Sequence, residues 1–166
     1  KNIWPKLKEI YVKQVNDIKM GDVEDFSNFM NAVIDKSAFN SITKYIDDAK
    51  KSDNITVLTG GGYDGSIGYF IEPTTLVTTD PKYTTMCEEI FGPVLTIFIY
   101  DPDKWSETLE LVDSTSPYAL TGCVWGNDRY AVNEATEKLT HAAGNFYIND
   151  KPTGAVVGQQ PFGGGR

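Results

Sequence analysis

In the second half of this chain, apolar runs of strand length alternate with amphipathic stretches of helical length, and this alternation limits the possible folds. The predicted strands cover residues 94–100, 120–125 and 144–149. The predicted helices lie between them, near residues 104–114, with Val112 facing inward, and near residues 130–141, with Asp128 as the N-cap. Strands that alternate with helices of about ten residues are typical of parallel crossovers. We therefore predict an α/β fold with a mostly parallel twisted sheet and flanking helices.

The first half is less regular, but its apolar spacing predicts two further helices. Apolar residues recur at helical spacing over residues 3–18. Asp35 is a favoured helix N-cap residue type, and a second helix is predicted after it. Its expected buried face consists of Phe39, Ile42, Tyr45, Ile46 and Ala49. Residues 55–59 and 68–77 are predicted to be extended, and Pro73 makes the second segment an edge strand or interrupts it.

Length and charge exclude several classes of function. With 166 residues the chain fits one domain with a substantial core. Its net charge of −8 argues against nucleic acid or an anionic membrane as a partner, because both attract positive surfaces. No apolar run approaches the roughly 20 residues that span a bilayer.

The thiols and the single histidine do not form an evident catalytic or metal site. Cys87 is followed by two carboxylates, which disfavour a thiolate, and Cys123 lies inside an apolar strand. We predict that both thiols are free and that neither is a nucleophile. His141 has no metal-ligand partner at suitable spacing, so no metal site is predicted.

The glycine-rich run at residues 60–65 matches the spacing of a dinucleotide-binding fingerprint, but its context does not fit. Such a fingerprint must open a helix, whose amides receive the pyrophosphate. The residues that follow here are predicted to be extended. We therefore interpret the run as a turn between strands.

The sequence Glu88-Glu89-Ile90-Phe91-Gly92-Pro93, which we call the hexad, directly precedes the predicted strand at 94–100. A carboxylate in that place can accept hydrogen bonds from a sugar diol, and an aromatic side chain can pack against a flat ring. The simpler interpretation is a solvated acidic pair at a turn.

The glycine-rich tail is the second candidate site. Its glycines allow backbone amides to approach a ligand carboxylate closely, and Phe162 offers a ring to an apolar substrate. The simpler interpretation is a mobile terminus with a chance aromatic residue.

Taken together, these segments resemble the catalytic domain of the aldehyde dehydrogenase superfamily. The segments that carry the resemblance are 68–74, the hexad, 145–149 and 161–164. Residues 149–151, 153–154 and 158–164 resemble its 1-pyrroline-5-carboxylate dehydrogenase (L-glutamate γ-semialdehyde dehydrogenase) branch most closely. The resemblance implies a partial catalytic domain at 1–150, and a substrate-anchor loop with a truncated tail at 151–166.

The resemblance also implies a role for five residues. Glu89 would bind the nicotinamide ribose hydroxyls of NAD, and Phe91 would support the nicotinamide ring. Gly154 and Ala155 would receive the substrate carboxylate, and Phe162 would pack against the substrate's carbon chain. Ala155 departs from the branch, which often has serine there, so a side-chain hydrogen bond to the carboxylate is missing.

The implied activity is the NAD-dependent oxidation of L-glutamate γ-semialdehyde to glutamate in proline catabolism. The implied longer protein is a homo-oligomer in the cytoplasm, or in the mitochondrial matrix of a eukaryote. Its nucleophilic cysteine and general base would precede Lys1, so no catalytic residue is assigned here and the chain alone is expected to be inactive. Two alternatives stay open: another semialdehyde dehydrogenase, or an α/β binding or assembly module without chemistry.

Overall fold

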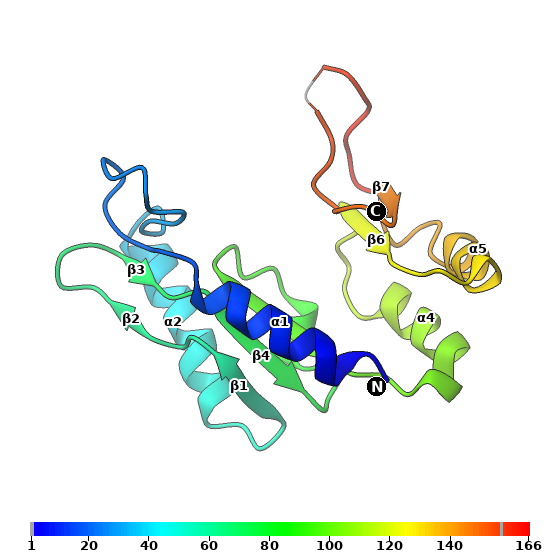
Figure 1. Ribbon diagram of the computed structural model, residues 1–166, viewed down its shortest axis with the longest axis horizontal. Coiled ribbons are helices and arrows are strands. Elements are labelled where there is room, and N and C mark those ends of the chain that lie inside the picture. The colour runs from blue at the N-terminus through cyan, green and yellow to red at the C-terminus, as the bar shows by residue number, and fades with distance from the viewer. Residues whose placement is uncertain (1, 157) are drawn as a thin grey trace. The chain divides into compact units, whose positions relative to one another are not determined.

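The computed structural model describes residues 2–156 and 158–166. It divides into two compact units, of which the first covers residues 1–102 and the second residues 103–166. The glycine-rich tail therefore belongs to the second unit. Most of the helices and strands are labelled in Figure 1.

The first unit contains a three-stranded sheet in the order β1–β4–β5. β4 (Thr74–Thr78) pairs antiparallel with β1 (Ile55–Thr59) and parallel with β5 (Val94–Phe98). The predicted α/β class is confirmed, but the pairing is mixed rather than mostly parallel. The reason is the connection from β1 to β4, which contains the antiparallel strands β2 (Tyr63–Asp64) and β3 (Phe70–Ile71) instead of a crossover helix.

Two backbone features of that connection were predictable. β3 ends before Pro73 and β4 begins after it, so the extended segment is interrupted there, as expected. The run at 60–65 is a turn, also as expected, and no helix follows it. Gly60 has a φ of 73°, and a Cβ on it would lie 2.2 Å from the carbonyl oxygen of Pro73. Only glycine fits this turn without strain.

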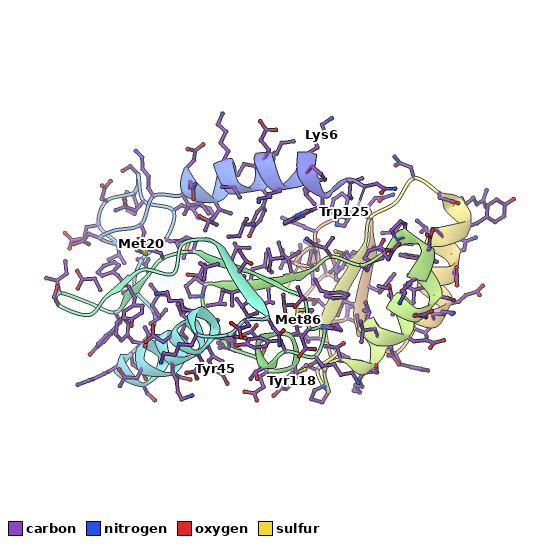
Figure 2. The ribbon with its side chains drawn as sticks, turned by 90° about the horizontal axis from the view of Figure 1, so that it is seen from below. Lys6, Met20, Tyr45, Met86, Tyr118 and Trp125 are labelled. Atoms are coloured by element: carbon purple, nitrogen blue, oxygen red, sulfur yellow. The ribbon has the colours of Figure 1, made fainter. Side chains whose placement is uncertain are left out.

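Two helices cover opposite faces of the sheet (Figures 1 and 2). On one face lies α1 (Trp4–Asn16), whose Tyr11 hydroxyl is 2.8 Å from the Thr75 hydroxyl on β4. On the other lies α2 (Lys36–Lys50). The core between α2 and the strands consists of Ile42, Ile46 and Ile71, with Val33, Ala38, Phe39, Ile90 and Val94 packed around it. The predicted inner face of α2 is thus largely confirmed.

Asp35 caps α2 as predicted, because its carboxylate accepts a hydrogen bond of 2.7 Å from the backbone N–H of Ala38. Replacing this acceptor leaves a helix-terminal donor without its partner. We expect Asp35→Ala to lower the free energy of unfolding by about 1 kcal/mol, measured by urea denaturation. Asp53→Ala, which changes an exposed aspartate outside any helix cap, is the matched control. Equal losses in the two variants would contradict the capping role.

The second unit contains a βαβ arrangement preceded by a helix. After a short 3₁₀ turn comes α4 (Trp105–Ser114), followed by β6 (Thr121–Val124), α5 (Arg129–Lys138) and β7 (Asn145–Ile148). β6 and β7 pair in parallel, as predicted. The core consists of Leu109, Ala135 and Leu139, with Trp105, Val124, Ala142 and Phe146 around it.

Two details of this unit differ from the sequence-based expectation. Val112 was predicted to face inward but is half exposed, since α4 turns only Trp105 and Leu109 into the core. The helix after Asp128 ends at Lys138 rather than near His141, which lies in the turn that follows. Asp128 does cap α5, through the backbone N–H groups of Tyr130 and Ala131.

Candidate functional site

The hexad connects the short helix α3 (Thr84–Cys87) to β5 and is held tightly against the sheet. The backbone N–H of Thr74 on β4 donates to the carbonyl of Pro93 at 2.8 Å. The N–H of Val94 donates to the carbonyl of Gly92 at 2.7 Å, which closes a narrow turn around Pro93. The last part of the hexad is therefore a fixed entry to β5.

The backbone at Phe91 has an unusual conformation that directs its side chain outward. Its φ is +58°, in the left-handed region, where a non-glycine residue costs about 1–2 kcal/mol. Ile90, one position earlier, packs against the core, whereas the Phe91 side chain is 86% exposed. A bulky side chain that is held out by an unfavourable backbone is a feature of ligand-binding sites.

Gly92 places this turn directly on the core. A Cβ at Gly92 would lie 2.5 Å from Cδ1 and 2.9 Å from Cγ1 of Ile42. Ile42 is only 1% exposed, so it has little room to move away. The absence of a side chain at Gly92 therefore determines how closely the Phe91 turn approaches α2.

We expect Gly92→Ala to lower the free energy of unfolding by about 1–3 kcal/mol, because the added methyl group overpacks the core at Ile42. Urea denaturation of the chain measures this effect. Gly163→Ala is the comparison, because a Cβ there meets no atom within 4 Å and its φ, like that of Gly92, lies outside the left-handed region. If Gly92→Ala lowers the free energy of unfolding no more than Gly163→Ala does, the packing argument is wrong.

The two acidic residues of the hexad have different environments. The Tyr45 hydroxyl on α2 donates a hydrogen bond to the Glu88 carboxylate, and Tyr45 is labelled in Figure 2. Glu89 is exposed, and its carboxylate has no hydrogen-bond or ion-pair partner within the described residues. Glu88 is thus engaged in structure, while Glu89 is available to a ligand.

A polar hollow of about 440 Å³ between α2 and α3 adjoins Glu88. It includes Lys44, which lies 2.6 Å from the Asp48 carboxylate. That hydrogen bond raises the pKa of Lys44 and lowers the pKa of Asp48. The Lys44 ammonium is therefore bound within α2.

The cysteines lie in environments that suit structural thiols. Cys87 ends α3, is half-buried, and its Sγ lies 3.4 Å from the carbonyl oxygen of Lys82. Cys123 is half-buried within β6. Both are free thiols. Among the residues that the structure describes, no group of three or more His, Cys, Asp or Glu side chains is arranged to hold a metal ion.

The other predicted site residues lie in the second unit, after β7. Gly154 and Ala155 are half-buried, and the Phe162 side chain is 60% exposed. A Cβ at Gly154 would lie 3.1 Å from Cε1 of Tyr147, so its backbone packs closely on that ring. The Tyr147 hydroxyl is buried and has no hydrogen-bond partner in residues 2–156 and 158–166. A buried hydroxyl without a partner can donate a hydrogen bond to a polar group beside the loop.

The closing part of the tail is docked onto the start of β7. A Cβ at Gly144 would lie 1.7 Å from the carbonyl oxygen of Gly163, so only glycine permits this approach. The Arg166 guanidinium forms an ion pair of 2.9 Å with Asp113 and donates to the carbonyl of Ser116 at 3.0 Å. The tail around Phe162 is therefore held by its own contacts within the second unit.

Comparison with protein families now identifies the chain. The model of the aldehyde dehydrogenase family matches residues 1–166. The chain belongs to the aldehyde dehydrogenase family. The hexad and the tail, which were singled out on chemical grounds, are thus parts of an aldehyde dehydrogenase sequence.

Known members of the family show how much of an aldehyde dehydrogenase the chain represents. The "Delta-1-pyrroline-5-carboxylate dehydrogenase, mitochondrial" of Dictyostelium discoideum is 54% identical over 165 residues, 99% of this chain and 30% of that protein. A crystal structure of the Delta-pyrroline-5-carboxylate dehydrogenase from Mycobacterium tuberculosis, bound with NAD and cobalamin, has a TM-score of 0.91 and 44% identity over 98% of this chain and 30% of that chain. The chain thus spans about a third of the length of these relatives.

A member with a different substrate in its name is less similar. The betaine aldehyde dehydrogenase of Staphylococcus aureus, crystallised as a double mutant in complex with NAD⁺, has a TM-score of 0.84 and 30% identity over 99% of this chain and 32% of that chain. The backbone fold is therefore similar in family members whose names specify different aldehydes. These members differ mainly in their side chains.

The residues predicted for the cofactor and for the substrate lie in different units. Glu89 and Phe91 belong to the first unit, and Gly154, Ala155 and Phe162 belong to the second. Glu89, Phe91 and Phe162 are exposed, and Gly154 and Ala155 are half-buried. Sequence reasoning gave no role to Gly144 or Asn145, which contact the closing tail. A Gly-Asn pair at the start of a strand was the only signal for them.

Proposed function

We propose that this chain is part of an NAD-dependent 1-pyrroline-5-carboxylate dehydrogenase, which oxidises L-glutamate γ-semialdehyde to glutamate in proline catabolism. The observation that carries the proposal is 54% identity to a relative with that name, over nearly the whole chain. Identity to a betaine aldehyde dehydrogenase is only 30%, although its backbone is similar. Because fold alone does not specify substrate, this difference in side chains is the relevant evidence.

In this proposal the hexad holds part of the NAD. The free carboxylate of Glu89 accepts hydrogen bonds from the nicotinamide ribose hydroxyls. The exposed ring of Phe91 packs against the nicotinamide and limits its orientation. The two residues fit these tasks because neither side chain is engaged elsewhere among the described residues. Bound NAD⁺ supplies the hydride acceptor for aldehyde oxidation.

The tail holds the substrate in the same proposal. The backbone N–H groups at Gly154 and Ala155 donate to the substrate carboxylate, and the Phe162 ring packs against its carbon chain. Ala155 lacks the hydroxyl that the branch often provides at this position, but its backbone donor remains. Uniform binding of the carboxylate and the chain lowers KM, so we assign these residues to substrate affinity.

The remaining parts of the enzyme are proposals about the longer protein. Neither Cys87 nor Cys123 has the surroundings of a nucleophile, so we place the nucleophilic cysteine elsewhere in the full-length protein. We also propose a homo-oligomer, located in the mitochondrial matrix of a eukaryotic source or in the cytoplasm of a bacterial one. None of the described helices has the length and apolar character needed to cross a bilayer.

The test is steady-state kinetics of the full-length protein with NAD⁺ and several semialdehydes. We expect kcat/KM to be highest for L-glutamate γ-semialdehyde, and at least about tenfold lower for succinic semialdehyde, which lacks the carbon atom that carries the amino group. Preference for succinic semialdehyde would favour the alternative of another semialdehyde dehydrogenase. Absence of NADH formation with every aldehyde, together with absence of NAD⁺ binding, would favour a non-catalytic module.

A further inference from the structure

Asn145 connects the first residue of β7 to the backbone on both sides of Phe162. Its side-chain Nδ2 donates to the carbonyl of Pro161 at 2.9 Å. Its Oδ1 accepts from the backbone N–H of Gly163 at 3.3 Å. A single amide group thus bonds the residue before Phe162 and the residue after it, as a neighbouring strand would.

We call these two hydrogen bonds the Asn145 bridge. The bridge is important because the backbone around Phe162 is intrinsically flexible. Phe162 is followed by three consecutive glycines, which have the widest range of backbone conformations. The Phe162 side chain is 60% exposed, so packing within the chain does not hold the ring firmly. Hydrogen bonds to the flanking backbone are then the principal constraint on its direction.

The other contacts of the tail lie further along it. The N–H of Gly165 donates to the carbonyl of Ala119 at 2.8 Å, and Arg166 pairs with Asp113. These contacts fix the end of the tail but leave two rotatable residues between them and Phe162. Gly144 permits close approach of Gly163 but supplies no side chain to hold it.

We propose that Asn145 is a positioning residue for Phe162, which fixes the ring for contact with the carbon chain of the aldehyde substrate. The contact between Phe162 and the substrate rests on the proposed function. The restraint of residues 161–163 by Asn145 is argued from its two hydrogen bonds alone. Asn145 itself does not touch the reacting atoms in this proposal. It acts by keeping the backbone of residues 161–163 in one conformation.

The first experiment examines the backbone without using activity. Hydrogen–deuterium exchange of the full-length protein is compared for wild type, Asn145→Ala and Asn133→Ala. Asn133 is an exposed residue of α5 in the same unit, so it is a matched control. We expect amides of residues 162–165 to exchange about tenfold faster in Asn145→Ala and at the wild-type rate in Asn133→Ala. Unchanged exchange in Asn145→Ala would overturn the proposal.

The second experiment is a double-mutant cycle with Phe162→Ala, using the aldehyde that the full-length protein oxidises. Asn145→Ala is expected to raise KM about five- to tenfold with kcat changed less than about twofold. In the Phe162→Ala background, the same change should have less than about a twofold effect, because the ring it positions is absent. Full additivity of the two changes would show a general structural role and overturn the proposal.

A conservative variant keeps the test decisive if Asn145→Ala fails to fold. Asn145→Asp retains the size of the side chain and the acceptor for the Gly163 N–H, but loses the donor to Pro161. We expect its exchange rates to lie between those of wild type and Asn145→Ala. Wild-type rates in Asn145→Asp would contradict the need for both bonds. If the wild-type protein does not oxidise glutamate semialdehyde, the proposed function is wrong. The hydrogen–deuterium exchange experiment still tests the role of Asn145 in that case.

Discussion

The isolated 166-residue chain is expected to produce NADH from L-glutamate γ-semialdehyde at least about 10⁴-fold more slowly than the full-length protein. Aldehyde oxidation of the proposed kind needs a thiolate that adds to the carbonyl carbon. Cys87 is half-buried beside two carboxylates, and Cys123 is half-buried within a strand. Loss of a nucleophile removes most of the rate enhancement of a catalytic unit. Initial rates of NADH formation, with the folded state checked by circular dichroism, measure the difference.

Cysteine variants of the full-length protein test whether Cys87 or Cys123 takes part in the chemistry. Cys87→Ser and Cys123→Ser are each expected to change kcat less than about threefold, because neither thiol takes part in the chemistry. Turnover by the folded chain at a rate close to that of the full-length protein would contradict the prediction. So would a loss of activity in either serine variant without a loss of stability.

Removal of the Glu89 carboxylate is expected to weaken NAD binding strongly. In the proposed site this carboxylate accepts two hydrogen bonds from the ribose diol, and hydrogen bonds to charged groups contribute about 1.5–3 kcal/mol each. The lower value for both bonds corresponds to roughly a hundredfold change in affinity. We therefore expect Glu89→Leu to raise the Kd for NAD⁺ about a hundredfold in the full-length protein, measured by titration calorimetry.

Glu88 provides the matched control, because it is the adjacent residue with the same side chain. Its carboxylate is already bonded by the Tyr45 hydroxyl, so Glu88→Leu is expected to change the Kd for NAD⁺ less than about threefold. A larger effect at Glu88 than at Glu89 would reverse our assignment of the two carboxylates. Unfolding measurements on both variants exclude a general loss of structure as the cause.

Features that depend on neighbouring residues in the sequence were predictable. Asp35 and Asp128 were recognised as N-caps because a short acidic side chain reaches amides of the next turn. β1 has the predicted bounds, since its β-branched run lies between turn residues. The helix face of α2 followed from apolar spacing, which reflects the period of the helix itself.

Features that depend on distant parts of the chain were not predictable in the same way. The left-handed backbone at Phe91 is set by Gly92 packing on Ile42 and by the bond from Thr74 to Pro93. The difference between Glu88 and Glu89 arises from Tyr45, which is 43 positions away from Glu88. Val112 has an apolar side chain at helical spacing, yet α4 has only a narrow buried stripe.

From the sequence alone we could predict the α/β class, the positions of most helices and strands, and two candidate binding segments, the hexad and the glycine-rich tail. Tertiary structure alone decided the antiparallel pairing of β1, the free carboxylate of the acidic pair, and the bridge from Asn145 to the backbone around Phe162. The physical reason is the range of the interactions. Caps, turns and periodicity act over a few residues, whereas strand pairing and side-chain partners are chosen among groups that only folding brings together.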